Sequence, residues 1–354
     1  MEILKLNETP MRTSKNYGIN NIKLENINIP TKINEFSGCE INGDIENVLE
    51  NAEIDNTQIK YGVGNILVEQ VTNSSNKKIK IVSDKNENKE TQIDFNFDSE
   101  NMCLVDNVEI IAEKNTNKTI ILKYESKDSV EHFHNGIIRL FAKENSKIDI
   151  IIVNLLNEKS NNFISIQNEL EKNANVNYII VELGAKNSVS NYYSNIIGDN
   201  AKNLLNTIYL GKENQVFDMN YIAELRGMKT NIDIEVQGAL KDNAKKNFKG
   251  TIDFKKGAKK AVGNENEYCM LLSDTAKSIA LPMLLCTEDD VEGNHSSAAG
   301  KIDDKQLFYI MSRGFSVKEA MKLIVKSRFN KILENVKNEK LKDEIINNID
   351  RRLD

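Results

Sequence analysis

The sequence has no tryptophan and only three prolines, and it contains no apolar run of the 18 or more residues that a membrane-spanning helix needs. Its first residues also lack the order of basic, apolar and small residues that marks a secretion signal. We therefore expect the chain to remain in the reducing cytosol, where disulfide bonds are rare.

Several motifs that define enzyme classes are absent. No GxxxxGK[ST] phosphate loop occurs, so the chain should not hydrolyse ATP itself. The Gly62-Val63-Gly64 segment lacks the third glycine of a dinucleotide-binding motif, and there is no GxSxG nucleophile elbow. The four cysteines form no CxxC pair, which disfavours an autonomous zinc site, and the net charge of −6 argues against a nucleic-acid-binding groove.

A short turn phrase recurs along the middle of the chain. Its second residue stands at positions 146, 160, 174, 188, 201, 215, 230, 244 and 258, which gives a period of about 14. The phrases are followed by short runs rich in β-branched and aromatic residues, such as Val176–Val181 and Leu205–Leu210. This spacing fits a meander of antiparallel hairpins, or a β-helix with two units per coil. We prefer the β-helix, because stacked coils bury their inward residues and Asn suits the tight corners.

The flanks of the repeat have different patterns. Residues 1–64 form a mixed region, in which Gly43–Leu49 predicts a short helix. Residues 65–300 are assigned to the β-helix core. From residue 301 the apolar period becomes that of a helix, and residues 301–354 are predicted to form a C-terminal helical domain.

Capping signals divide this helical domain into three helices. Asp303 or Asp304 can cap the first helix, which should end near Gly314. Ser316 and Glu319 have the spacing of a capping box and should begin the second helix. A charged segment from about residue 338 to 352 predicts the third.

The segment from Met270 to Phe315 carries the motifs of a known family. It contains DDVEGNHSSAAG (Asp289–Gly300), followed by LFYIMSRG (Leu307–Gly314). These strings resemble the signature of the SufB/SufD family, the scaffold proteins of SUF iron–sulfur cluster assembly, and the resemblance is closer to SufD. By position, the reactive cysteine of SufB-type members falls on Glu267, and the SufB-type glutamate falls on Ser296.

The resemblance implies a mainly β fold, a right-handed parallel β-helix with a helical C-terminal domain. It also implies a non-catalytic scaffold that pairs with a SufB-like subunit, or with itself as a homodimer. The partners would include SufC, an ABC-type ATPase, and an iron–sulfur cluster would be bound transiently at the subunit interface. Candidate residues for docking the ATPase are Phe308, Arg313, Gly314, Phe315 and Met321.

His295, Cys269 and Cys286 are the candidate iron or cluster ligands. His295 matches the SufD-type interface histidine, and neutral imidazole is a competent iron ligand; the alternative is a structural histidine at a corner between solenoid and helix. The polar neighbours of Cys269 permit exposure of its thiolate, whereas Cys286 has the surroundings of a buried strand residue. His132 and His134 alternate along a possible strand, but two histidines alone make a weak metal site.

Two other functions fit a β-helix. One is a polysaccharide-active enzyme that uses paired carboxylates on a solenoid face. The scarcity of aromatic residues for sugar stacking, the absence of a secretion signal and the helical tail argue against it. The other is a passive protein-interaction solenoid without metal chemistry.

Overall fold

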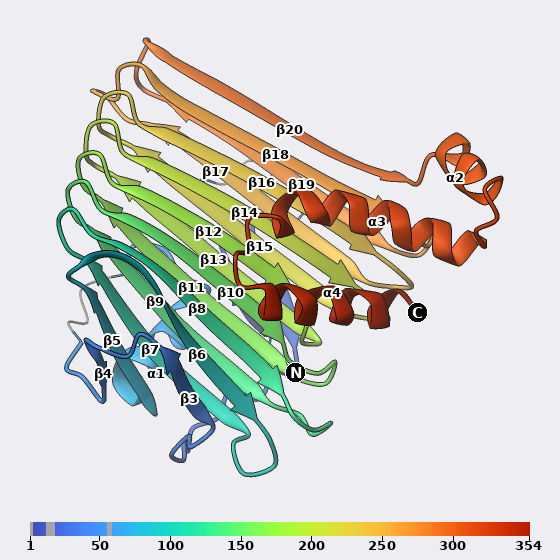
Figure 1. Cartoon of the computed structure of the whole chain (residues 1–354), viewed down its shortest axis with the longest axis horizontal. Helices are drawn as coiled ribbons and strands as arrows, with labels where there is room; N and C mark the ends of the chain where they lie inside the picture. The colour runs from blue at the N-terminus through green and yellow to red at the C-terminus, as the bar shows by residue number, and fades with distance from the viewer. Residues whose placement is uncertain (1–2, 12–17, 55–58) are drawn as a thin grey trace.

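The computed structural model describes residues 3–11, 18–54 and 59–354. Within these ranges the chain forms a mainly β, parallel solenoid followed by C-terminal helices (Figure 1). Each coil contributes one strand to each of two facing nine-stranded sheets. No helix in the same ranges has both the length and the hydrophobicity needed to span a membrane.

We call the two sheets even-numbered and odd-numbered, after the numbers of most of their strands. The even-numbered sheet ends at β3, and the odd-numbered sheet ends at β4. The strands of the even-numbered sheet are, in order, β20 (Val291–Lys301), β18 (Ala261–Leu271), β16 (Asn231–Leu240), β14 (Lys202–Gly211), β12 (Asn175–Glu182), β10 (Lys147–Leu155), β8 (Asn117–Ser126), β6 (Asn86–Phe97) and β3 (Cys39–Gly43). Those of the odd-numbered sheet are β19 (Lys277–Cys286), β17 (Lys245–Phe254), β15 (Val216–Leu225), β13 (Asn187–Ile196), β11 (Asn161–Leu170), β9 (Phe133–Ala142), β7 (Cys103–Ala112), β5 (Lys77–Ser83) and β4 (Val48–Glu50).

The strand register explains the 14-residue period. Lys147 pairs in parallel with Asn175, and Asn175 pairs with Lys202, so that one coil uses two sequence units. The β-helix prediction is therefore confirmed and the hairpin meander is wrong for this region.

One row of corners is built from asparagines in the left-handed conformation, at Asn115, Asn145, Asn173 and Asn200. Each amide from Asn145 onward donates to the side-chain oxygen of the asparagine one coil before it, at 2.8–3.2 Å. Asparagine tolerates positive φ better than other non-glycine residues, which accounts for its recurrence in the turn phrase.

The interior of the solenoid is one continuous apolar core. Aliphatic and aromatic side chains from both sheets fill it, including Tyr124, Tyr178, Tyr192, Tyr221 and Phe248. Burial of each such side chain contributes roughly 1.5–3 kcal/mol, so that stacking of coils supplies most of the stability.

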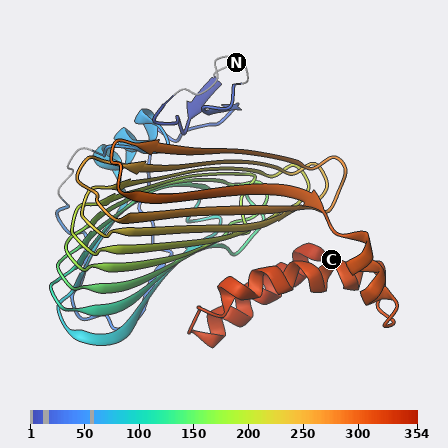
Figure 2. The ribbon, with the colours of Figure 1, turned by 90° about the horizontal axis from the view of Figure 1, so that it is seen from above.

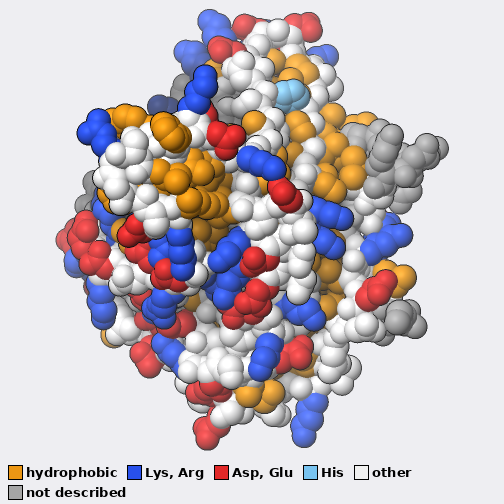
Figure 3. All heavy atoms as spheres, turned by 90° about the vertical axis from the view of Figure 1, so that its right-hand side faces the viewer, with side chains coloured by type: hydrophobic (Ala, Val, Ile, Leu, Met, Phe, Trp, Pro, Cys, Tyr) orange, Lys and Arg blue, Asp and Glu red, His pale blue; other side chains and the backbone are white. Residues whose placement is uncertain are grey.

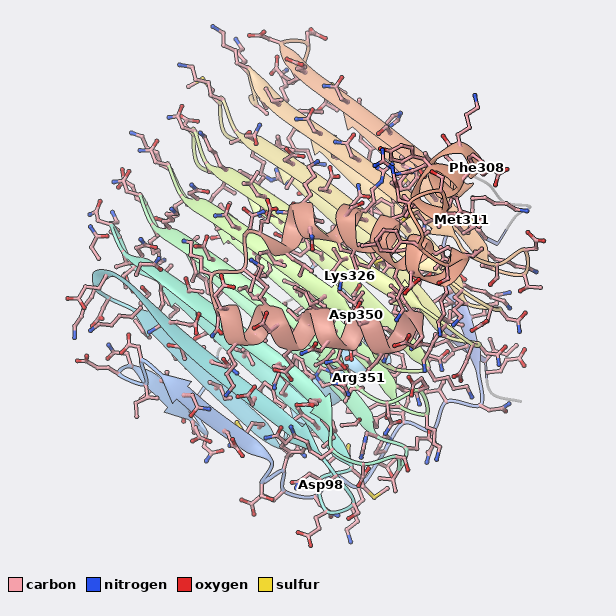
Figure 4. All side chains as sticks on the ribbon, turned by 45° about the vertical axis from the view of Figure 1, so that its right-hand side comes forward. Asp98, Phe308, Met311, Lys326, Asp350 and Arg351 are labelled. Carbon is pink, nitrogen blue, oxygen red and sulfur yellow. The ribbon has the colours of Figure 1, made fainter. Side chains whose placement is uncertain are left out.

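The C-terminal helices cover the outer face of the even-numbered sheet (Figure 2). The helices are α3 (Val317–Leu333) and α4 (Glu339–Leu353), and their buried residues join Ile151 and Ile179 of the sheet in one cluster. Lys326 of α3 and Asp350 of α4 point toward each other and form an ion pair at 2.8 Å (Figure 4).

The N-terminal segment covers part of the opposite face. It contains the antiparallel strands β1 (Ile3–Leu6) and β2 (Ile22–Glu25) and the helix α1 (Asn65–Ser74). Leu6 and Leu67 belong to an apolar cluster that includes Phe163 of β11. The outer faces of both sheets are thus partly covered, by helices on one side and by the N-terminal segment on the other.

The capping predictions are confirmed. Asp303 caps α2 (Asp304–Met311) by accepting the Lys305 backbone N–H at 2.8 Å, and Ser316 with Glu319 forms the complete capping box of α3. Gly314, beyond the end of α2, has a φ of +96°.

The helix predicted at residues 43–49 is wrong. The segment instead contains the end of β3 and the start of β4, which pair with β6 and β5. Gly43 and Asn47 both have positive φ, which interrupts any right-handed helix. Backbone hydrogen bonds to the first coil outweigh a weak local helix propensity.

Candidate functional site

The last coil of the solenoid lies open at one end. Among the described strands, β20 pairs only with β18 and β19 pairs only with β17, so that each has a free edge. Most of β20 is exposed, and the apolar side chains of Ile279 and Leu284 on β19 are exposed as well. An uncovered strand edge offers unpaired N–H and C=O groups to another chain.

His295 lies in the middle of β20, in register with Glu265 of β18. It is therefore a strand residue, and the corner position considered from the sequence is wrong. Side chains in register on adjacent parallel strands point to the same face, and Glu265 points into the solenoid. His295 faces the same way, but it is exposed because no further coil covers it.

Cys269 lies on the same inward face of β18 and is fully buried. Burial raises the pKa of its thiol, although the nearby Lys246 charge partly lowers it. The exposure that its polar neighbours would permit is therefore not found. Side chains along β18 alternate between its outward and inward faces, and that of Cys269 lies on the inward face.

Cys286 is the last residue of β19 and is exposed, with its thiol donating to the Glu288 carbonyl at 2.9 Å. The expectation of a buried strand residue is also wrong. Cys286 is in register with the buried Phe254 one coil earlier, so it takes an inward position in a coil that nothing covers.

The structure does not bring the three candidate ligands together. Cys269 is in register with Ala299, four residues beyond His295 along β20. At ~3.3 Å per residue, this corresponds to about 13 Å along the strand. Cys286 lies on the other sheet. In the parts of the chain that are described, no three His, Cys, Asp or Glu side chains form a group that could hold a metal ion.

A buried ion pair lies directly inside the open end. Lys246 Nζ is 2.7 Å from Glu267 Oε1, and both side chains are fully buried. Glu267 Oε2 accepts a hydrogen bond from Ser297 of the last coil at 2.7 Å, and Tyr209 donates to Oε1 at 3.3 Å. A buried pair of this kind needs such additional bonds to offset desolvation.

Glu265 lies beside this pair and is only 1% exposed. Neither of its carboxyl oxygens has a hydrogen-bond partner among the described residues. Burial, with a smaller contribution from the Glu267 charge, raises its pKa to about 8. A Cβ on Gly250 would lie 2.1 Å from Glu265 Oε2, so glycine at that position leaves the space for the carboxyl group.

Glu265 is not among the candidate residues that the sequence motifs indicate. The signal was present in Gly263–Cys269, where alternation puts Glu265, Glu267 and Cys269 on one face of a strand. This alternation indicates a site only if that face of the strand is the interior of the solenoid.

The two other histidines belong to the solenoid. His134 is fully buried, with Nε2 2.8 Å from Asp106 Oδ1 and Nδ1 2.5 Å from Asn162 Oδ1. Burial lowers the pKa of His132. Both imidazoles are hydrogen-bonded to side chains of the solenoid.

A second exposed surface lies on α2 and the start of α3, which we call the α2 patch. It comprises Phe308, Tyr309, Met311, Phe315 and Val317. Phe308 is 73% exposed, and α2 has no buried residue. Figure 4 places Phe308 and Met311 on α2, which projects from the solenoid, and apolar side chains gather on this side of the molecule (Figure 3).

The predicted docking residues lie in or next to this patch. Arg313 stacks over the Tyr309 ring, with its guanidinium carbon 5.1 Å from the ring centroid, and donates to the Tyr309 hydroxyl at 3.0 Å. Gly314 is exposed beside them. Met321 is only partly exposed and lines two shallow cavities together with Leu272.

Most of the solenoid, the open end and α2 match one family model. The model that describes the SufBD core domain of SUF-system iron–sulfur cluster assembly matches residues 95–328, which is more than half of the chain. The chain belongs to the SufBD family. The match extends from the end of β6 through the last coil and α2 into α3.

Relatives named as SufD support the SufD side of the SufBD family. The chain is 25% identical to the iron–sulfur cluster assembly protein SufD of Bacillus subtilis over 72% of its own length and 59% of that protein. It is 24% identical to SufD of Escherichia coli over 66% of its length and 56% of that protein. A SufBD family protein of Pyrococcus horikoshii is 28% identical over 68% of this chain and 54% of its own length. The matched region thus spans between half and three fifths of these relatives.

Proposed function

We propose that the chain is a non-catalytic scaffold subunit of iron–sulfur cluster assembly. It pairs through its open end with a SufB-like subunit or with a second copy of itself, and it binds a SufC-type ABC ATPase through the α2 patch. The cluster is a transient cargo, and the cytosol is the expected compartment. The observation that carries this proposal is an uncovered last coil, with His295 exposed on it, in a chain of the SufBD family.

The geometry of the open end supports pairing with another subunit. Both strands of the last coil have a free edge, so a partner can continue both sheets by strand addition. The inward residues of this coil, among them His295 and Cys286, are exposed in the single chain and would be covered by such a partner. Because the candidate ligands do not form one group within the described residues, a cluster would need ligands from the partner as well.

The α2 patch supports a second, separate contact. A helix with no buried residue and large exposed aromatic side chains has the composition of a protein-binding surface, where aromatic residues and Arg are enriched. The patch follows directly after the last coil in the sequence, so an ATPase bound there would lie close to the subunit interface.

The test is anaerobic purification of the tagged chain from its native cytosol, with identification of partners and assays of iron and sulfide. We expect recovery of an ABC-type ATPase and of a SufB-like subunit or a second copy. Phe308→Asp should lose the ATPase but keep the other subunit, because it places a charge in the centre of the α2 patch. Ile45→Asp is the matched control, since Ile45 is also exposed but lies in the N-terminal region.

His295→Ala should keep both partners and reduce the iron and sulfide recovered with them. Recovery of the wild-type chain alone, free of metal and of ATPase, would contradict the scaffold. Recovery with protein partners but without iron or sulfide would favour the passive interaction solenoid. Membership of the SufBD family favours the scaffold over a polysaccharide-active enzyme.

A further inference from the structure

Glu265 is a buried carboxyl group that the fold leaves without a partner. It is 1% exposed, and neither oxygen accepts or donates a hydrogen bond within the described residues. An ionised carboxylate in such a place costs several kcal/mol unless a cation or hydrogen-bond donors compensate it. A cation bound beside the carboxylate would offset this cost.

The nearest buried cation does not compensate Glu265. Lys246 bonds Glu267 at 2.7 Å and the Ile279 carbonyl at 3.2 Å. Glu267 in turn also accepts from Ser297. Two carboxyl groups therefore share one face of β18, and only Glu267 is paired.

The position of Glu265 connects it with the open end. Its carboxyl group occupies the space above Gly250, and the next residues along the solenoid axis are those of the last coil. The residue in register with Glu265 there is His295, on the same face of an adjacent strand ~4.8 Å away. One carboxylate and one imidazole, neighbours at the mouth of the solenoid, form a donor pair that suits divalent iron.

We propose that Glu265 is a second ligand, with His295, for a divalent iron ion at the open end of the solenoid. The remaining ligands are supplied by water or by the partner subunit, because among the described residues no third His, Cys, Asp or Glu side chain joins these two in a group that could hold a metal ion. The inference rests on the proposed scaffold function and adds to it a residue that holds the incoming metal. Glu265 is suited to this role because it is a buried carboxyl group beneath the open end, and neither of its oxygens has a hydrogen-bond partner among the described residues.

The experiment uses Co2+ as an anaerobic probe for Fe2+, added to the full-length chain and followed by visible absorption. We expect saturable binding of one Co2+ per chain. Glu265→Gln and His295→Ala should each weaken it by at least tenfold, and the double variant should be little weaker than either single variant. The matched control is Glu292→Gln, which makes the same substitution on the exposed, outward face of β20 and should change the affinity less than twofold.

Far-UV circular dichroism at the same pH should show that the three single variants keep the solenoid. Equal affinity in Glu265→Gln and in the wild type, with weaker binding in His295→Ala, would overturn the role of Glu265. Failure of the wild-type chain to bind Co2+ saturably would overturn the site. These outcomes are distinct from failure of the scaffold itself, which would appear as a wild-type chain purified without partners.

Discussion

The replacement Glu265→Gln should remove a pH dependence of stability that one buried carboxyl group creates. Its pKa rises from an ordinary value of 4.5 to about 8 in the folded chain, chiefly through burial. Between these values the folded state holds a proton that the unfolded state has lost, so the free energy of unfolding falls as the pH rises. The stabilising effect of the proton is complete below pH 4.5 and is lost by pH 8.

The magnitude follows from the shift of about 3.5 pH units. At ~1.4 kcal/mol per unit, the wild-type chain should lose at most about 5 kcal/mol of stability from this group between pH 4.5 and pH 8. Glutamine keeps the shape but does not titrate, so Glu265→Gln should be more stable than the wild type at pH 8.5 and similar to it at pH 5.

Urea unfolding followed by far-UV circular dichroism at these two pH values measures the difference directly. Glu292→Gln, on the exposed outer face of β20, serves as control and should follow the wild type at both. Parallel pH profiles for Glu265→Gln and the wild type would refute the reasoning, because they would mean that Glu265 is solvated or paired in the folded chain.

Three further predictions concern the packing, the buried ion pair and the cap of α3. Gly238→Ala puts a Cβ 1.9 Å from a ring carbon of Tyr209 and should lower the free energy of unfolding by about 3 kcal/mol, measured by urea unfolding. Lys246→Met leaves Glu267 buried without its cation and should cost roughly 3–5 kcal/mol at pH 7, whereas adding Glu267→Leu should recover most of that loss. Ser316→Ala removes the cap of α3 and should cost about 1 kcal/mol, visible as a lower thermal midpoint.

The solenoid could be predicted because its information is local and repeated. Each corner in this row needs a residue that tolerates positive φ, and an asparagine occupies that position once per coil, at Asn145, Asn173 and Asn200. Capping at Ser316 is local in the same way. The segment around Gly43 was misread because its conformation depends on pairing with β6, which lies some 50 residues further along the chain.

The candidate site was harder to predict because it depends on where the stack of coils ends. Cys286 has the sequence surroundings of a buried residue, and it would be buried if another coil followed. Cys269 has polar neighbours and is buried, because alternation turns it inward in a coil that is covered. Sequence reasoning identified His295 through a motif, but nothing in the motif indicates that Glu265 lies in register with it.

The open end also differs chemically from the rest of the solenoid. Solenoid proteins usually close their ends with polar caps, because an exposed interior face is apolar. Here the outer faces of both sheets are partly covered, yet the last coil is bare, and the interior beneath it contains Lys246, Glu267 and Glu265, which has no hydrogen-bond partner among the described residues. These buried polar and charged groups stabilise the chain less than apolar side chains in their place would. Their position beneath the uncovered last coil is explained if a second subunit covers that coil.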